Sequence, residues 1–277
     1  MIDPISETVI QAELRKLAGN SASLGLRFEI REETVSTNDD ATKAGSRGEL
    51  DGLVIVADHQ TNGRGRRENR WESPPGKNLM FSIVLRPTEP IDQWTRIPHL
   101  IGLAVARGIE SAIPGIQEIE LKWPNDLMFL DRKLGGILVE SRISQDSSGS
   151  FCAVGVGLNV NIRPAEFPDD VREIAASLFE KTDRVLSRSI LLAHILAEWI
   201  AIYPASISNF ESAKQAIESR SFLNGRAVEV HTGSEIVTGL AKSIGPDGEL
   251  LVQTSEKTVE IRSAERVRRV DSEASCR

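Results

Sequence analysis

Glycines and arginines alternate in one short stretch, which is the clearest chemical signal in the sequence. The stretch is Gly63–Arg67, and it follows an apolar run, Leu53–Ala57, and a polar loop. Glycine lets the backbone approach a ligand closely, and arginine offers planar, permanently charged donors to carboxylates and phosphates. With Arg70 included, four arginines against Glu68 give a formal charge of +3. The pattern indicates an anion clamp, although a solvated basic loop has the same composition.

A second polar cluster follows a short apolar alternation. Ile119–Trp123 alternates as a strand does, and the alternation stops at Pro124. We expect Asn125 and Asp126 in a turn beside Lys122, where their side chains can reach a nucleotide or a metal ion. A turn in which these side chains only cap their own backbone is the alternative interpretation.

Glycines also interrupt an apolar strand in the segment Gly155–Asn161. Glycines inside strands often mark the close approach of a ligand, and the amide of Asn159 then offers both a donor and an acceptor. A tight strand crossing is the better explanation for either glycine alone.

The elements that must position these residues form a sheet with helices against it. Four short apolar runs predict buried strands: Leu53–Ala57, Leu79–Leu85, Gly136–Glu140 and Phe151–Leu158. A further strand is expected near Leu26–Ile30. Helical spacing predicts helices at Ile5–Leu17, Ala41–Ala44, Ile97–Ile113 and Ser189–Tyr203. We expect the last two helices to cover one face of the sheet.

After Phe222 the pattern changes to short alternating segments separated by glycine-rich turns. They are Ala227–His231, Ile236–Ile244, Leu250–Thr254 and Thr258–Arg262. Such segments are typical of hairpins in a small β-barrel. We therefore divide the chain into one domain of residues 1–217 and another of residues 218–277.

Composition and charge argue against several classes of protein. The formal charge of −7 and the pI near 5.3 disfavour nucleic-acid binding. Cys152 and Cys276 form no CxxC pair, which fits a reducing compartment. We find neither a signal peptide nor an apolar run that approaches the roughly 18 residues of a membrane span, and the four histidines show no metal-site spacing. We expect a cytoplasmic protein.

Six motifs occur together in the order and spacing of one family. They are Ser36–Asn38, Gln60 with Gly63–Arg67, Trp71–Leu79, Lys122–Asp126, Lys133–Leu138 and Gly157–Asn159. In these motifs the sequence resembles biotin-protein ligases, most clearly from Thr34 to Asn161. The resemblance implies a mixed α/β (α+β) catalytic domain, in which helices flank a mixed sheet as in class II aminoacyl-tRNA synthetases, and then an SH3-like barrel. It also implies that biotin is activated with ATP and Mg²⁺ as biotinoyl-5'-AMP and passed to a lysine of a biotin carboxyl carrier protein.

The resemblance assigns roles by position. Biotin would be bound by Ser36, Thr37, Asn38, Gln60, Gly63, Arg64, Arg66, Lys133, Gly136 and Gly157. The adenylate would be bound by Arg66, Arg67, Trp71, Lys122, Asn125, Asp126, Lys133 and Asn159. Arg64, Arg66 and Lys133 would be the catalytic cations, and Asp126 would orient or deprotonate the acceptor lysine.

The sequence departs from this family at two places. Glu68 and Asn69 stand where many relatives have a glycine and another basic residue. The residues before Thr34 are too few for a helix-turn-helix unit, so we expect a ligase that binds neither DNA nor a membrane. Whether it forms a homodimer stays open. The alternatives are a lipoate or octanoate ligase and a non-catalytic nucleotide-binding regulator.

Overall fold

The computed structural model describes residues 4–19, 25–144, 149–233 and 235–270, without the side chain of Glu68. The helices are α1 Glu7–Ala18, α2 Thr37–Ser46, α3 Ile97–Ala112, α4 Phe179–Thr182, α5 Arg188–Ser206 and α6 Glu211–Ser219. Short 3-10 turns are η2 Arg66–Glu68, η3 Ile91–Arg96 and η4 Pro164–Glu166. The strands of the larger domain are β1 Arg27–Thr34, β2 Leu53–Gln60, β3 Gly63–Arg64, β4 Arg70–Trp71, β5 Leu79–Leu85, β6 Glu120–Lys122, β7 Asp126–Phe129, β8 Arg132–Arg142 and β9 Phe151–Leu158. Those of the barrel are β10 Ala227–Thr232, β11 Glu235–Ile244, β12 Leu250–Gln253, β13 Thr258–Ile261 and β14 Arg266–Arg269.

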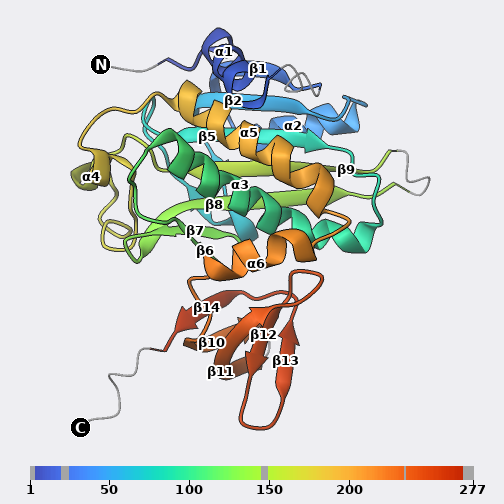
Figure 1. Cartoon of the computed structure of the whole chain (residues 1–277). Helices are drawn as coiled ribbons and strands as arrows, with labels where there is room; N and C mark the ends of the chain where they lie inside the picture. Colours follow the sequence, from blue (N-terminus) through green and yellow to red (C-terminus); the bar gives the residue numbers. More distant parts are fainter. Residues whose placement is uncertain (1–3, 20–24, 145–148, 234, 271–277) are drawn as a thin grey trace.

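Seven strands of the larger domain form one mixed sheet, in the order β1-β2-β5-β9-β8-β7-β6 (Figure 1). β1 and β2 are parallel, and the other pairs are antiparallel. β5 and β9 have the bounds that their apolar runs predict, because each is buried along almost its whole length. The mixed α/β fold expected from the sequence is therefore confirmed.

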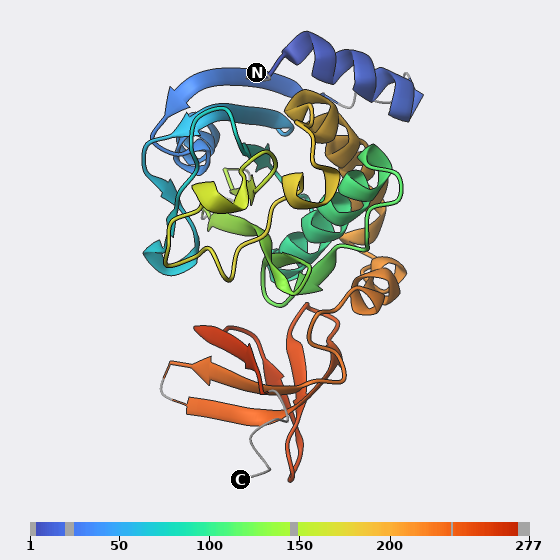
Figure 2. The same ribbon diagram turned by 90° about the vertical axis from the view of Figure 1, so that its left-hand side faces the viewer.

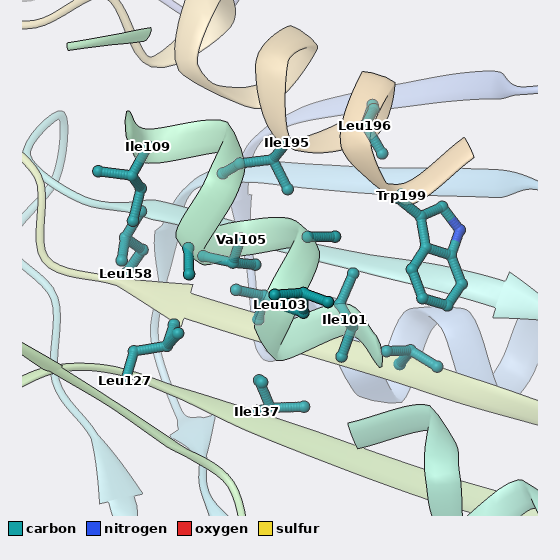
Figure 3. Close-up of a cluster of buried hydrophobic side chains, with 14 of the residues drawn as sticks. Ile101, Leu103, Val105, Ile109, Leu127, Ile137, Leu158, Ile195, Leu196 and Trp199 are labelled. Carbon is teal, nitrogen blue, oxygen red and sulfur yellow. The ribbon is translucent and has the colours of Figure 1, made fainter. Parts of the chain in front are cut away.

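Helices cover both faces of this sheet. α3 and α5 pack on one face, and Ile101 and Ile109 of α3 and Trp199 of α5 belong to the same buried cluster as side chains of the sheet (Figure 3). On the other face Ala41 and Ala44 of α2 pack against β2, β5 and β9. Small residues suit α2 because they bring its N-terminus close to the sheet. That N-terminus carries part of the candidate site.

α5 has the length and composition of a membrane span. The sequence alone had indicated no apolar run of that length. The helix has 19 residues, and its mean hydropathy over the most apolar window is 1.4. Half of that window is buried inside the protein, and α5 packs on both α1 and α3. We interpret α5 as the central helix of the core, since a helix that is apolar all round suits such burial.

Arg188 at the start of α5 joins β2 to the residue that precedes β5. Its side chain is fully buried, and it donates to Oδ1 of Asp58 at 2.6 Å and to the carbonyl of Asn78 at 3.1 Å. An isolated buried charge is very unfavourable, so loss of Asp58 would leave the guanidinium unbalanced and destabilise the fold. The pair thus connects α5 to the end of β2, from which the chain continues to the arginine-rich loop.

The C-terminal barrel has its own core and packs below β6 (Figures 1 and 2). The chain passes between the two cores after α6, because Ile217 belongs to the sheet core and Phe222 to the barrel core. The predicted division after residue 217 falls inside α6. Trp123 and His99 of the larger domain both donate to the carbonyl of Gly248 at 2.9 Å. These bonds attach the barrel beside the candidate site.

Candidate active site

A cavity of about 240 Å³ lies where the end of the sheet, the arginine-rich loop and the barrel meet. Most residues assigned from the sequence line it: Ser36, Thr37, Asn38, Gln60, Arg64, Arg66, Arg67, Trp71, Lys122, Asn125, Asp126, Lys133, Gly136 and Gly157. A neighbouring cavity of about 310 Å³ shares the wall made by Arg66, Asn125 and Ile137. The fold thus brings five separate segments of the sequence into one place.

The N-terminus of α2 supplies one polar wall of the cavity. Ser36 caps the helix, and its Oγ accepts a hydrogen bond from the backbone N–H of Asp39. The backbone N–H and the Oγ1 of Thr37 both donate to Oε1 of Gln60, at 2.8 and 3.0 Å. Because two donors occupy this oxygen, the amide of Gln60 is held in one orientation and keeps Nε2 as its donor.

The first arginine of the loop is bound by two carboxylates. The guanidinium of Arg64 forms an ion pair with Asp39 and lies 3.3 Å from Oε2 of Glu140. Glu140 also accepts a hydrogen bond from Nδ2 of Asn38 at 2.6 Å. These contacts join the loop to α2 and β8. The sequence assigned Arg64 to the cations that face phosphoryl oxygens, but the structure places its guanidinium on carboxylates of the protein.

The next two arginines point to different partners. Arg67 has a left-handed backbone, with φ of 55°, and its guanidinium forms an ion pair with Glu265 of the barrel. Nη1 of Arg66 donates to Oδ1 of Asn125 at 3.3 Å. Burial and the adjacent charge of Arg67 lower the pKa of Arg66. A half-buried cation beside a like charge is an attractive position for an anion.

The hairpins of β6, β7 and β8 carry the remaining charges. Nζ of Lys133 lies 2.6 Å from Oδ1 of Asp126. Lys122 faces Asp126 across the hairpin, and burial lowers the pKa of Lys122, a shift that Lys133 and Arg266 increase and Asp126 opposes. Asn125 is fixed by donating Nδ2 to the carbonyl of Ile137 at 2.7 Å. One carboxylate thus stands among several cations.

Gly136 of β8 and Gly157 of β9 pair in the sheet but differ in how much space surrounds them. A Cβ added to Gly157 would lie 2.7 Å from Cε2 of Trp71, whereas one added to Gly136 would be 3.6 Å from the nearest side-chain atom, in Lys133. The indole of Trp71 therefore lies directly on β9. Its Nε1 is buried and has no hydrogen-bond partner among the described residues, so it can donate to a ligand.

Two residues assigned from the sequence do not line the cavity, and one whole segment was missed. Gly63 does not line the cavity and is packed against Gln60 and Trp71, since an added Cβ would lie 2.7 Å from Nε2 of Gln60 and 2.6 Å from the carbonyl oxygen of Trp71. Asn159 is buried, and its amide bonds to Asn78 and to the carbonyl of Ala176, both at 3.1 Å; it connects strands and loops. The missed segment is Ala264–Val267, at the barrel side of the cavity. No local pattern marks it, since only the docking of the barrel brings it there.

Comparison with known proteins agrees with this geometry. Residues 33–159 match the Biotin/lipoate A/B protein ligase family, and residues 224–265 match the Biotin protein ligase C terminal domain. The chain is 32% identical over 258 residues to the bifunctional ligase/repressor BirA of Bacillus subtilis, covering 90% of this chain and 78% of that protein. The chain belongs to the biotin protein ligase family. The biotin--[acetyl-CoA-carboxylase] ligase of Mycobacterium tuberculosis is 31% identical, over 84% of this chain and 85% of that protein.

Solved biotin protein ligases also share the fold. The enzyme of Aquifex aeolicus, in complex with biotin and ATP, superposes with a TM-score of 0.75 at 31% identity, covering 88% of this chain and 99% of that one. The apo structure from the same organism gives a TM-score of 0.73 at 28% identity and the same coverage of this chain. The resemblance of the motifs to biotin protein ligases is thus confirmed over both domains.

The site combines the fixed amide of Gln60 with a concentration of positive charge from arginine and lysine side chains, which suits a polar ring joined to a phosphate ester. Among the described residues, no group of three or more His, Cys, Asp or Glu side chains could hold a metal ion.

Proposed function

We propose that this chain forms biotinoyl-5'-AMP from biotin and ATP and transfers the biotinoyl group to a lysine of a biotin carboxyl carrier protein. The observation that carries the proposal is the convergence of Gln60, Arg66 and the Asp126–Lys133 pair around one cavity. Membership of the family supports this reaction. We place the protein in the cytoplasm, because ATP is available there.

In the first half-reaction, a carboxylate oxygen of biotin attacks the α-phosphorus of ATP. The bond from this phosphorus to the bridging oxygen of the β-phosphate breaks, and pyrophosphate leaves. Charge grows on the phosphoryl oxygens, and Arg66 and Lys133 are the cations that we place there. Arg64 instead holds the loop in position, because Asp39 and Glu140 already balance its charge.

A magnesium ion would reach this site with the triphosphate. Mg²⁺ prefers oxygen ligands and commonly keeps phosphates and waters in its coordination shell. Among the described residues, the carboxylates that line the cavity are Asp126 and Glu265; Asp126 would hold the ion, which would supply positive charge to the leaving pyrophosphate.

In the second half-reaction, the neutral amine of the acceptor lysine attacks the carbonyl carbon of the mixed anhydride. An amide bond forms, the C–O bond to AMP breaks, and the amine loses a proton. We place Asp126 as the group that orients this amine or accepts its proton, since it is the carboxylate closest to Lys133.

The proposal is tested by pyrophosphate release. The purified protein with ATP should release pyrophosphate when biotin is added. Lipoate in place of biotin should give none, whereas a lipoate ligase would show the reverse preference. Binding of ATP with no release under either condition would instead favour a non-catalytic regulator.

A further inference from the structure

Seven cationic side chains line the cavity, and most of them have a carboxylate partner. They are Arg64, Arg66, Arg67, Arg70, Lys122, Lys133 and Arg266. The paired ones are Arg64 with Asp39 and Glu140, Arg67 with Glu265, Arg70 with Glu72, and Lys133 with Asp126. The remaining cations have no carboxylate to balance their charge before a ligand binds.

Three cations on the cavity wall have no ion pair within the part of the chain that the structure describes: Arg66, Lys122 and Arg266. They come from three elements that are far apart in sequence. The positive charges of Lys133 and Arg266 add to burial in lowering the pKa of Lys122, so the cations act on one another. Like charges placed together without an anion are unfavourable, and a polyanion would relieve this repulsion.

Arg266 is the contribution of the barrel. It begins β14, which lies at the side of the barrel nearest β6 (Figure 1). Glu265, its neighbour, holds Arg67 of the arginine-rich loop and donates its backbone N–H to the carbonyl of His231. The position of Arg266 therefore depends on its neighbour Glu265, which contacts both the barrel and the arginine-rich loop.

The alternation of β14 separates Arg266 from its neighbours. Val267 is buried in the barrel core, so Arg266 and Arg268 stand on the opposite, exposed face. Only the first of these two lines the cavity. Arg268 lies opposite Glu229 in the ladder with β10. The strand thus contains a closely matched control for Arg266.

We propose that Arg266, together with Lys122, binds the β- and γ-phosphates of ATP next to Arg66 at the α-phosphate, so that the barrel completes the pyrophosphate subsite. The inference rests on the proposed function and adds to it a residue outside the family motifs. Guanidinium groups suit phosphate oxygens because they donate two hydrogen bonds at once.

This assignment separates the two half-reactions. The β- and γ-phosphates leave as pyrophosphate before the acceptor lysine attacks. Arg266 therefore contributes to ATP binding and to the reverse reaction with pyrophosphate, and it contributes nothing to biotin binding or to transfer from preformed biotinoyl-adenylate.

The test compares Arg266→Ala with Arg268→Ala in the full-length protein. Calorimetry gives the dissociation constants for MgATP, pyrophosphate and biotin, and single-turnover transfer starts from preformed biotinoyl-adenylate. We expect Arg266→Ala to weaken binding of both phosphate ligands about tenfold or more, the size of a lost charge-assisted hydrogen bond. Arg268→Ala should leave them within about twofold, and Arg266→Lys should recover part of the loss because it restores the charge.

Two results would overturn the inference. Equal affinities of the two alanine variants for pyrophosphate would remove Arg266 from the subsite. Normal phosphate binding with slow transfer in Arg266→Ala would assign the residue to docking of the acceptor instead. Both readouts of phosphate binding are independent of biotin, whereas the proposed function is tested by biotin-dependent pyrophosphate release in the wild type.

Discussion

Replacing Gly157 with alanine should weaken adenylate binding while leaving the fold largely intact. The new methyl group would lie 2.7 Å from Cε2 and 3.0 Å from Nε1 of Trp71. Those distances are far below van der Waals contact, so either the backbone of β9 or the indole of Trp71 must move. β9 is paired on both sides within the sheet, whereas Trp71 is only partly buried and lies on a two-residue strand. We therefore expect the indole to be displaced into the cavity.

The size of the effect follows from the cost of overpacking. Inserting a methylene into a tightly packed place costs about 1–3 kcal/mol, which corresponds to roughly a 5- to 150-fold change in a binding constant. Because the indole can move, most of this cost should appear in ligand binding and little in the melting temperature. The assay is calorimetry with a non-hydrolysable analogue of biotinoyl-adenylate, accompanied by thermal melting.

Gly136→Ala is the matched control. Gly136 faces Gly157 in the ladder between β8 and β9, but its added Cβ would lie 3.6 Å from Lys133, an ordinary contact. We expect Gly136→Ala to weaken binding less than Gly157→Ala does, because its methyl group displaces no side chain and adds only its own volume to the cavity wall. Similar affinities for the two variants, or a Gly157→Ala protein that binds the analogue as the wild type does, would refute the role given to Trp71.

Three further substitutions test the roles of single groups. Lys133→Ala should fold and lose about 10²- to 10³-fold in adenylate synthesis, measured as pyrophosphate release, because one preorganised cation is removed; near-normal release contradicts its assignment. Asp126→Asn keeps an acceptor for Lys133 but no base, so single-turnover transfer from preformed biotinoyl-adenylate should slow, and transfer at full speed rules the role out. Burial lowers the pKa of His99 to about 4 from an ordinary 6.5. The unfolded chain therefore binds more protons between these values, and roughly 3 kcal/mol of stability should be lost as the pH falls from 6.5 to 4. Urea unfolding of the wild type and of His99→Gln, which keeps a donor for Gly248 but does not titrate, checks this; an equal loss in both proteins would point to other groups.

The sequence predicts the elements that have strong apolar patterns. β5 and β9 are buried runs of branched and aromatic residues, and their predicted bounds are confirmed. β14 escaped prediction because its four residues include three arginines and only one apolar side chain, Val267. A strand of this kind is defined by its pairing with β10, which no local pattern records.

The site was predictable as a set of motifs and not as a set of contacts. Arg64 looked like a phosphate-binding cation, yet its partners are 25 and 76 positions away along the chain. Asn159 looked like a ligand-binding amide, but burial between Asn78 and Ala176 gives it a structural role. Residue type and spacing show that a group can do chemistry; only the fold shows which partner it already has.

The central claim is that this cavity joins biotin to a protein lysine through an adenylate. The most direct measurement is the intact mass of a biotin carboxyl carrier domain after incubation with the protein, biotin and MgATP. The account predicts that the carrier gains the mass of one biotinoyl group, and that a carrier whose acceptor lysine is replaced by arginine gains none. An unchanged carrier mass, with the protein folded and ATP present, would contradict it.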